Sequence, residues 1–332
     1  MKSIVQAVLV LLLISGCSGV EEPQVQGPDG EETQLDFTEL SEFPSHGRTG
    51  AFSFTMANKI YVGTGFGANA TYYGDFWEYD LMSNTWTEKS PFPLGPYMAG
   101  VTFVHQGKGY VLAGGTLSCP DFNVACDHIY YTTVHAYDPS SNTWEKVGEL
   151  PSFQGMNFGS VEIVGDKAIL FWDMKTYEIN LLDFQYSQKS NPPASIAFSA
   201  DFRVGNKVYF TCPMDSGRGT KFIYSYDLST DQWETLPDFP GIKRYNAVGF
   251  SLDGYGYILG GKESDLANED RQFKEIWQFN PNDISWKKVT DYPGAAYTDQ
   301  VLETVGNDIY MGFGDTRSYI KFEKDWWKLE IK

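Results

Sequence analysis

The chain has 332 residues and a formal net charge of −18, from 25 Lys and Arg against 43 Asp and Glu. Nucleic-acid binding needs clustered Lys and Arg that neutralise phosphates, so this balance argues against a nucleic-acid partner. The same acidity argues against electrostatic docking on anionic lipid, and a chain of this length can bury a large hydrophobic core.

The first residues show the three parts of a secretory signal peptide. Lys2 supplies a basic start, an apolar run follows from Ile4 to Ile14, and small residues precede Cys17. The apolar run is too short to cross a bilayer as a helix, which takes ~20 residues. We therefore predict that residues 1–16 are a signal peptide that is removed on export.

The sequence "ISGC" at the end of this run resembles the lipobox of bacterial lipoproteins. The resemblance implies cleavage before Cys17, acylation of Cys17, and contact with the membrane through that lipid alone. The expected location is the bacterial cell envelope, lipid-anchored to the outer membrane and either periplasmic or surface-exposed. The alternative is an ordinary signal peptide with a chance cysteine. Residues 17–32 mix acidic residues with Gly and Pro, which predicts a flexible acidic tether.

The remaining chain, residues 33–332, has the pattern of an all-β fold. Short alternating runs such as "KIYVGTG", "GYVLAGG", "KVYFTC" and "DIYMGFG" recur between turns rich in Gly, Asn and Asp. No stretch of a dozen residues carries an apolar stripe with the period of a helix. Alternation with period two predicts strands that are buried on one side.

The strands belong to a repeat. One apolar position recurs at intervals of 40 to 59 residues, at Tyr61, Tyr110, Ile169, Tyr209, Tyr257 and Tyr310. A later Tyr-Asp or similar pair is followed six residues on by a large aromatic residue, at Trp86, Trp144, Tyr186, Trp233 and Trp286. This period, with four short strands in each repeat, predicts a β-propeller. We expect the Asp to accept hydrogen bonds from its turn and the Trp to pack between neighbouring blades.

The two ends of the chain are predicted to share the last blade. The final repeat stops before its Trp strand, whereas Phe37 lies eleven residues before Arg48, as Trp233 lies eleven before Arg244. An N-terminal strand around Phe37 would therefore complete a sixth blade. The alternative is a seven-bladed ring with one unrecognised repeat.

The Gly pairs in "LAGG" and "ILGG", the Tyr-Asp pair and the Trp six residues later resemble the Kelch family of β-propellers. The resemblance covers about residues 33–332 and implies a six-bladed Kelch-type propeller closed by its N-terminal strand. It implies little about function, because one fold hosts many activities.

The long loops lie between the second and third strands of each repeat, which predicts that one face of the ring carries the functional site. Neutral drift in tolerated loops is the alternative. Cys119 and Cys126 flank "PDFNVA" in one of these loops. Because export permits disulfides, we predict a bridge between them, with two free thiols as the alternative. Cys212 would remain unpaired and buried.

The repeat register also predicts residues at the mouth of the central channel. Six residues lie thirteen before the recurring apolar position: Arg48, Tyr97, Met156, Ile196, Arg244 and Tyr297. Two Arg and two Tyr would suit a carboxylate or polyhydroxyl ligand. The Kelch resemblance implies an alternative, because an arginine here often makes structural bonds between blades. Further candidates are Tyr245, Asp299, Asn246, Trp172 and Asp173.

We interpret the chain as a monomeric binding module for a glycan or protein ligand, without a cofactor or metal, rather than as an enzyme. "MAGVTFVHQGKGYVLAGG" resembles a repeat of the periplasmic N-acetylneuraminate epimerases, which implies carboxylate binding by Arg48 and Arg244 and a base at Asp299 or Asp173. The long central insertion of that family is absent.

Kelch propellers also include the galactose-oxidase copper enzymes, but the ligands of such a site are not recognisable here. His105 falls in a short loop on the opposite face, and Cys212 has no partner motif. His46, His128 and His135 show no paired ligand spacing. Motifs for a nucleophile elbow, a phosphate loop, a dinucleotide or zinc are absent from the sequence.

Overall fold

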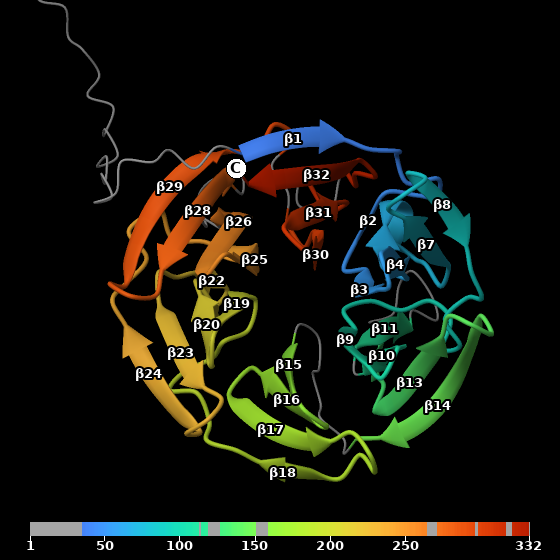
Figure 1. Ribbon diagram of the computed structural model, residues 1–332, viewed down its shortest axis with the longest axis horizontal. Helices are drawn as coiled ribbons and strands as arrows, with labels where there is room; N and C mark the ends of the chain where they lie inside the picture. Colours follow the sequence, from blue (N-terminus) through green and yellow to red (C-terminus); the bar gives the residue numbers. More distant parts are fainter. Residues whose placement is uncertain are drawn as a thin grey trace, which may run out of the picture.

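The structure is a computed structural model that describes residues 35–331, except 113, 119–126, 151–158, 264–270, 296–297 and 317–320. The described regular elements are strands and one 3-10 turn, Ala68–Ala70. The sheets stand around a central axis like the blades of a propeller (Figure 1). Cys17, Cys119, Cys126, Met156 and Tyr297 lie outside the described residues, so the acylation, the disulfide and two of the mouth positions stay predictions.

In the described part of the chain the ring consists of six antiparallel sheets, each with four main strands and one with a short fifth strand. From the channel outwards, the first blade contains β3 (Phe52–Met56), β4 (Lys59–Gly63), β7 (Phe76–Asp80) and β8 (Thr85–Glu88), and the second contains β9 (Val101–His105), β10 (Lys108–Leu112), β13 (Thr133–Asp138) and β14 (Thr143–Glu149). In the same order, the third blade contains β15 (Ser160–Val164), β16 (Lys167–Trp172), β17 (Lys175–Asn180) and β18 (Tyr186–Gln188), and the fourth contains β19 (Ala200–Val204), β20 (Lys207–Thr211), β23 (Ile223–Asp227) and β24 (Gln232–Leu236). The fifth blade contains β25 (Tyr245–Leu252), β26 (Tyr255–Glu263), β28 (Glu275–Asn280) and β29 (Ser285–Asp291), and the sixth contains β30 (Val301–Val305), β31 (Asp308–Gly312), β32 (Trp326–Ile331) and β1 (Leu35–Glu39).

The long connections between second and third strands carry small elements of their own. These are β5 (Phe66–Gly67) and β6 (Thr71–Tyr72), β11 (Gly115–Ser118) and β12 (Asp127–Tyr130), β21 (Met214–Asp215) and β22 (Arg218–Gly219), and β27 (Arg271–Gln272). A short strand at the entry to the first blade, β2 (Arg48–Thr49), pairs with β5. These loops are therefore ordered extensions of the blades over much of their length.

The N-terminal strand closes the ring, which confirms the six-bladed prediction. β1 runs antiparallel to β32 from Leu35 opposite Ile331 to Glu39 opposite Trp327 (Figure 1). The Phe37 ring meets Tyr292 edge-on, with 5.8 Å between ring centroids. Phe37 therefore packs against the end of the fifth blade, as expected of a residue in the Trp position of the repeat.

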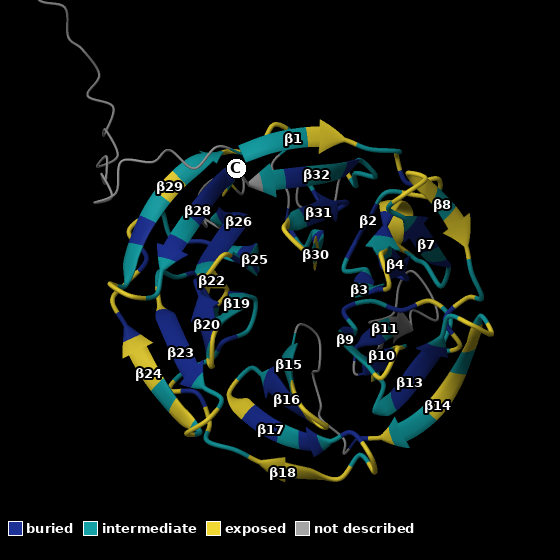
Figure 2. Ribbon diagram, in the orientation of Figure 1, coloured by how far each residue is buried: buried dark blue, intermediate teal, exposed yellow. Residues whose placement is uncertain are grey.

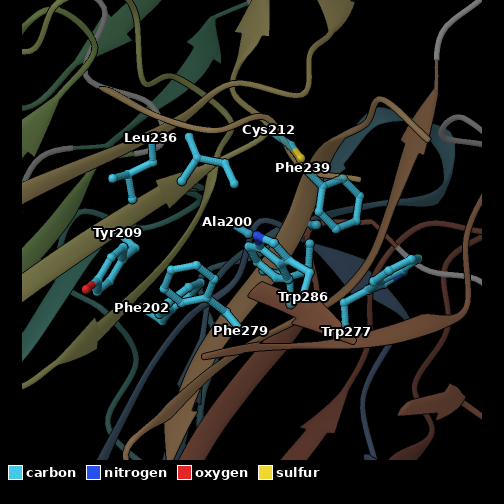
Figure 3. Close-up of a cluster of buried hydrophobic side chains, with 12 residues drawn as sticks. Ala200, Phe202, Tyr209, Cys212, Leu236, Phe239, Trp277, Phe279 and Trp286 are labelled. Carbon is cyan, nitrogen blue, oxygen red and sulfur yellow. The ribbon is translucent and has the colours of Figure 1, made fainter. Parts of the chain in front are cut away.

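Blade-to-blade packing is aromatic. In the cluster between the fourth and fifth blades, Trp286 lies edge-on to Phe239 at 5.1 Å and tilted against Phe279 at 4.9 Å (Figure 3). Cys212 is buried in the same cluster, and burial raises the pKa of its thiol to about 12. The outermost strands β8, β18 and β24 are mostly exposed, whereas the second strands β4, β16, β20 and β31 are mostly buried (Figure 2). Trp286 is therefore core, as predicted, and Trp86, Trp144 and Trp233 are partly buried and pack against the core clusters. Tyr186, at the same position of the third blade, is 46% exposed, and Cys212 is a buried thiol.

Hydrogen bonds fix three of the blades to the connection from the blade before. Trp144 Nε1 donates to Ser90 O at 3.0 Å, and Ser90 N donates to Asn142 Oδ1 at 3.0 Å. Equivalent bonds from Ser41 and Ser190 fix the first and fourth blades. The Tyr-Asp turns behave as predicted, because Asp80 Oδ1 accepts two backbone N–H groups of its own hairpin.

Candidate functional site at the mouth of the central channel

A ring of left-handed backbone surrounds the entrance to the channel. Gly50, Ala99, Phe198, Asn246 and Asp299 occupy one register position, eleven residues before the recurring apolar residue, and their φ angles lie between 53° and 60°. Ala99 N donates to Gly50 O at 2.8 Å and Asn246 N donates to Phe198 O at 2.9 Å, so backbone bonds join neighbouring blades here. Positive φ is uncommon outside glycine and tends to cluster at functional sites. We call these five residues the entrance ring.

The entrance ring borders a cavity of about 210 Å³ whose walls come from all six blades. A second space of about 250 Å³ shares Ser199, Asp201 and Gln300 with it and continues along the channel. The polar side chains of the first cavity include three carboxyl groups, Asp173, Asp201 and Asp299, and two amides, Asn246 and Gln300. Phe198 and Ile196 add apolar surface.

Asn246 and Asp299 form a pair across two blades. Asn246 Nδ2 donates to Asp299 Oδ2 at 2.8 Å, whereas Asn246 Oδ1 has no hydrogen-bond partner among the described residues. Only 6% of Asn246 is exposed, so this oxygen is a buried acceptor without a donor. Burial raises the pKa of Asp299 to about 7, with the positive charge of Lys262 opposing the shift.

A second carboxyl group lies further along the channel. Burial raises the pKa of Asp201 to about 7, and the neighbouring carboxylate of Glu162 adds to the shift. Glu162 itself accepts a hydrogen bond from Arg203 Nη1 at 3.3 Å. Two carboxyl groups that titrate near neutral pH in one channel can exchange protons with a bound molecule.

The wall contains the hydroxyl groups of Ser160 and Ser199. Ser199 Oγ donates to Ile196 O at 2.8 Å, and the Ser160 hydroxyl group acts on Asp201, whose pKa it lowers against the effect of burial. Ser195, outside the wall, donates from Oγ to Asp173 Oδ1 at 2.5 Å. Gln300 Oε1, like Asn246 Oδ1, has no partner in the described part of the chain. The cavity therefore presents mainly acceptor oxygens.

The two predicted arginines do not line this cavity. Arg48 and Arg244 are fully buried, and each guanidinium group bonds within its own blade. Arg48 donates to Asp75 at 2.6 and 2.9 Å, and Arg244 donates to Glu275 at 2.5 Å. Residues at this register also pair with the long loops, since Arg48 lies opposite Gly67 in the β2–β5 ladder. The printed bonds of both arginines are structural, but they run within one blade and not between neighbouring blades as the alternative had it, and the entrance is formed two residues further along the chain.

The other predicted residues divide into two groups. Tyr97 is buried in the core and does not line the cavity. Its hydroxyl group lies against the backbone of Gly114, so close that a Cβ atom added to that glycine would lie 2.3 Å from the hydroxyl oxygen. The Tyr245 ring lies 5.4 Å from Lys262 Nζ and does not contribute to the cavity wall. Asp299, Asn246 and Asp173 do line the cavity, whereas Trp172 does not.

The sequence analysis missed Asp201, Gln300 and Phe198. The signal was present in the repeat register: Asp201 is the acidic member of a position that carries Ser53, Thr102, Val161, Gly249 and Leu302 in the other blades. A single acidic residue at a repeat position that is small or apolar in the other blades indicates a side chain in the channel wall.

Two further observations limit the chemistry. Within the described ranges, no group of three or more His, Cys, Asp or Glu side chains could hold a metal ion. In the same part of the chain, no helix has the length and apolarity needed to span a membrane. His105 is the last residue of β9, next to the turn at the opposite face, and its Nε2 is 3.2 Å from Asp166.

Comparison with known proteins relates the chain to Kelch propellers. No protein-family model matches it. It is 24% identical over 319 residues to the Kelch-like protein terF of Aspergillus terreus, which covers 93% of this chain and 59% of that protein. It is 27% identical over 128 residues to the N-acetylneuraminate epimerase of Pasteurella multocida, which covers 38% of this chain and 33% of that protein.

A solved structure shares the fold. The structure of YjhT superposes with a TM-score of 0.72 at 16% sequence identity, covering 86% of this chain and 95% of that chain. At this identity the likeness concerns the fold alone. The chain spans 59% of terF and about a third of the epimerase, so it corresponds to part of each curated relative.

Proposed function

We propose that this chain, a Kelch-repeat propeller with distant similarity to the N-acetylneuraminate epimerases, binds a small carbohydrate at the mouth of its central channel. The observation that carries the proposal is the cavity of about 210 Å³ lined by carboxyl and amide oxygens. A sugar ring presents several hydroxyl donors for such acceptors. Its C–H faces would pack on apolar surface such as Phe198 and Ile196.

The charge of the wall favours some sugars over others. None of the described residues that line the cavity is Arg or Lys. An anionic sugar would therefore meet carboxylates without a compensating cation, and like charges at short range repel. A neutral or cationic sugar fits better than an acidic one. A protein ligand would instead contact the long loops of the same face.

Replacement of Asp299 with asparagine is expected to weaken sugar binding by about ten- to a hundredfold, because a hydrogen bond to a charged group contributes ~1.5–3 kcal/mol. Asparagine tolerates the left-handed backbone of this position, where φ is 53°. Asp253→Asn is the matched control, since Asp253 has φ of 50° in the β25–β26 turn on the opposite face. Saturation-transfer NMR against a panel of sugars measures the affinity. Equal affinity in both variants would contradict the proposed site.

A second candidate function is a sugar mutarotase or epimerase, favoured by the pKa values of about 7 at Asp201 and Asp299. Carboxyl groups that titrate near neutral pH can act as general acid and base. Two-dimensional exchange NMR separates the two functions. Accelerated interconversion of anomers, lost in Asp299→Asn, supports the enzyme; a sugar that binds without exchange supports the binding module.

We further propose that the protein is exported as a monomer and tethered to the outer membrane by lipid on Cys17, with residues 17–32 as spacer. The basis is the sequence pattern of residues 1–17. Cys17→Ala is expected to abolish labelling by radioactive palmitate and to release the protein from the membrane fraction or leave it unprocessed. Cys212→Ala is the control, because that thiol is buried. Labelling of Cys17→Ala at the wild-type level would refute the anchor.

A further inference from the structure

We propose that the ligand of the channel mouth carries a protonated amino group, received by Asp299, Asn246 and Gln300, so that the substrate class is an amino sugar rather than a neutral sugar. This inference rests on the proposed function for the position of the site. It goes further by naming the group that the cavity selects.

The unpartnered oxygens carry the inference. Asn246 Oδ1 and Gln300 Oε1 line the cavity and find no donor among the described residues. The amide of Asn246 is held in place, because its Nδ2 donates to Asp299 Oδ2 at 2.8 Å and 94% of the residue is buried. A buried acceptor without a donor is unfavourable, and a ligand that supplies the donor gains by satisfying it.

The chemistry of an ammonium group matches this set of acceptors. An ammonium group has three N–H donors and no acceptor. The site offers three kinds of acceptor for them: the Asp299 carboxylate, Asn246 Oδ1 and Gln300 Oε1. A hydroxyl group has one donor, and its own lone pairs would then face oxygen atoms. The arrangement therefore selects a group that only donates.

The charges around Asp299 also favour a cationic ligand. Lys262 of β26 and Asp315, which are both buried, act on Asp299 with opposite sign. Asp173 and Asp201 face the same cavity from the third and fourth blades. Four carboxyl groups against one lysine leave the described surroundings negative whenever these groups are ionised. A cationic ligand would offset that excess.

Protonation of Asp299 makes the inference measurable. Burial raises the pKa of Asp299 to about 7, so much of it is neutral in the empty site below that pH. A bound ammonium group favours the ionised form and lowers the pKa. Binding therefore releases a proton, and affinity for an amine increases as the pH rises toward 7. Between about pH 5.5 and 7 we expect roughly a tenfold gain, since the ionised fraction grows by about that factor.

The test is isothermal titration calorimetry of the mature protein with glucosamine, glucose and cyclohexylamine, a ring of similar size with an ammonium group but no hydroxyl. Glucosamine is expected to bind at least tenfold tighter than glucose, and only the amines should show the pH dependence. Glucose binding as tight as glucosamine would overturn the amine preference while supporting the sugar site. Cyclohexylamine binding without any sugar binding would support amine recognition and refute the proposed function. Failure of all three ligands would overturn both.

Variants connect the preference to its residues. Asn246→Ala is expected to lower glucosamine affinity about tenfold or more, because it removes the Oδ1 acceptor from the cavity. Asp299→Asn should remove both the preference for the amine and its pH dependence, whereas the control Asp253→Asn should retain them. A preference that survives in Asp299→Asn would refute the assignment. Where a variant does not fold, the pH dependence in the wild-type protein alone decides, because a flat profile contradicts the role of Asp299.

Discussion

Arg244→Ala is expected to destabilise the protein by about 3–5 kcal/mol without weakening ligand binding in the molecules that remain folded. Arg244 Nη2 donates to Glu275 at 2.5 Å and Nη1 donates to Gly260 O at 3.0 Å. The guanidinium group lies 4.2 Å from the centre of the Phe273 ring. Loss of the arginine leaves the buried Glu275 carboxylate without its charged donor, with Trp277 Nε1 still donating at 3.2 Å, and removes a donor from the Gly260 carbonyl. Urea denaturation monitored by Trp fluorescence measures the change.

The pH dependence of this loss provides a second readout. Burial alone would raise the pKa of Glu275, but the charge and hydrogen bond of Arg244 outweigh it and hold the pKa below its usual value of 4.5. The pair therefore stabilises the fold fully above the unfolded pKa of ~4.3 and loses this contribution as the pH falls through the lower, folded pKa. The stability difference between wild type and Arg244→Ala should shrink under acidic conditions.

A surface substitution is the control for this experiment. Lys146→Ala removes an ion pair to Glu149 whose side chains are 52% and 63% exposed, and it should change stability by less than ~1 kcal/mol. Arg48→Ala should behave like Arg244→Ala, because Asp75 holds it in the same way. If the arginine variants kept their stability and lost ligand affinity instead, the binding role predicted from the sequence would be right.

Removal of residues 1–40 is expected to cost the protein several kcal/mol and to lower its melting temperature markedly. The truncation deletes all five residues of β1 and exposes β32 as an unpaired edge. It also removes the Phe37 ring from its contact with Tyr292, and loss of a core aromatic typically costs ~3–5 kcal/mol. Differential scanning calorimetry measures the shift.

A shorter truncation is the matched control. Removal of residues 1–33 keeps β1 and should leave the melting temperature unchanged. A synthetic peptide that spans residues 34–42, added to the longer truncation, should restore part of the lost stability by pairing with β32. A 1–40 truncation that melts with the wild type would show that β1 contributes nothing to closure.

The fold could be predicted from the sequence because it repeats. The apolar strand position returns in all six repeats, and in five of them an aromatic residue follows the Asp or Asn of the Tyr-Asp pair by six residues. These positions are constrained by packing between sheets. The closing strand followed from the same spacing, since Phe37 stands at the interval before Arg48 that Trp233 keeps before Arg244. The repeated blades thus allowed the same residue spacing to be compared several times within one sequence.

The site was predicted less well, because the repeat register does not say where a side chain points. The prediction placed Arg48 and Arg244 at the entrance from the repeat register, whereas their carboxylate partners Asp75 and Glu275 lie 27 and 31 residues further along the chain. Those pairings depend on how the loops fold back. Asp299 was named as a further candidate, and it lies two residues beyond the register position used for the mouth residues. Asp201 was missed because its column looked small and apolar.

The entrance ring also bears on how propellers of this kind diversify. Its positions hold Gly, Ala, Phe, Asn and Asp on one shared left-handed conformation, with φ between 53° and 60°. Asn and Asp adopt this conformation more readily than other L-residues. Exchanging Ala99 for Asn or Asp would therefore add a polar group to the cavity while easing the backbone. The positions of the entrance ring therefore accept different side chains on the same backbone conformation. We expect that substitution at one of them can change the ligand without disturbing Arg48, Arg244 or the aromatic packing between blades.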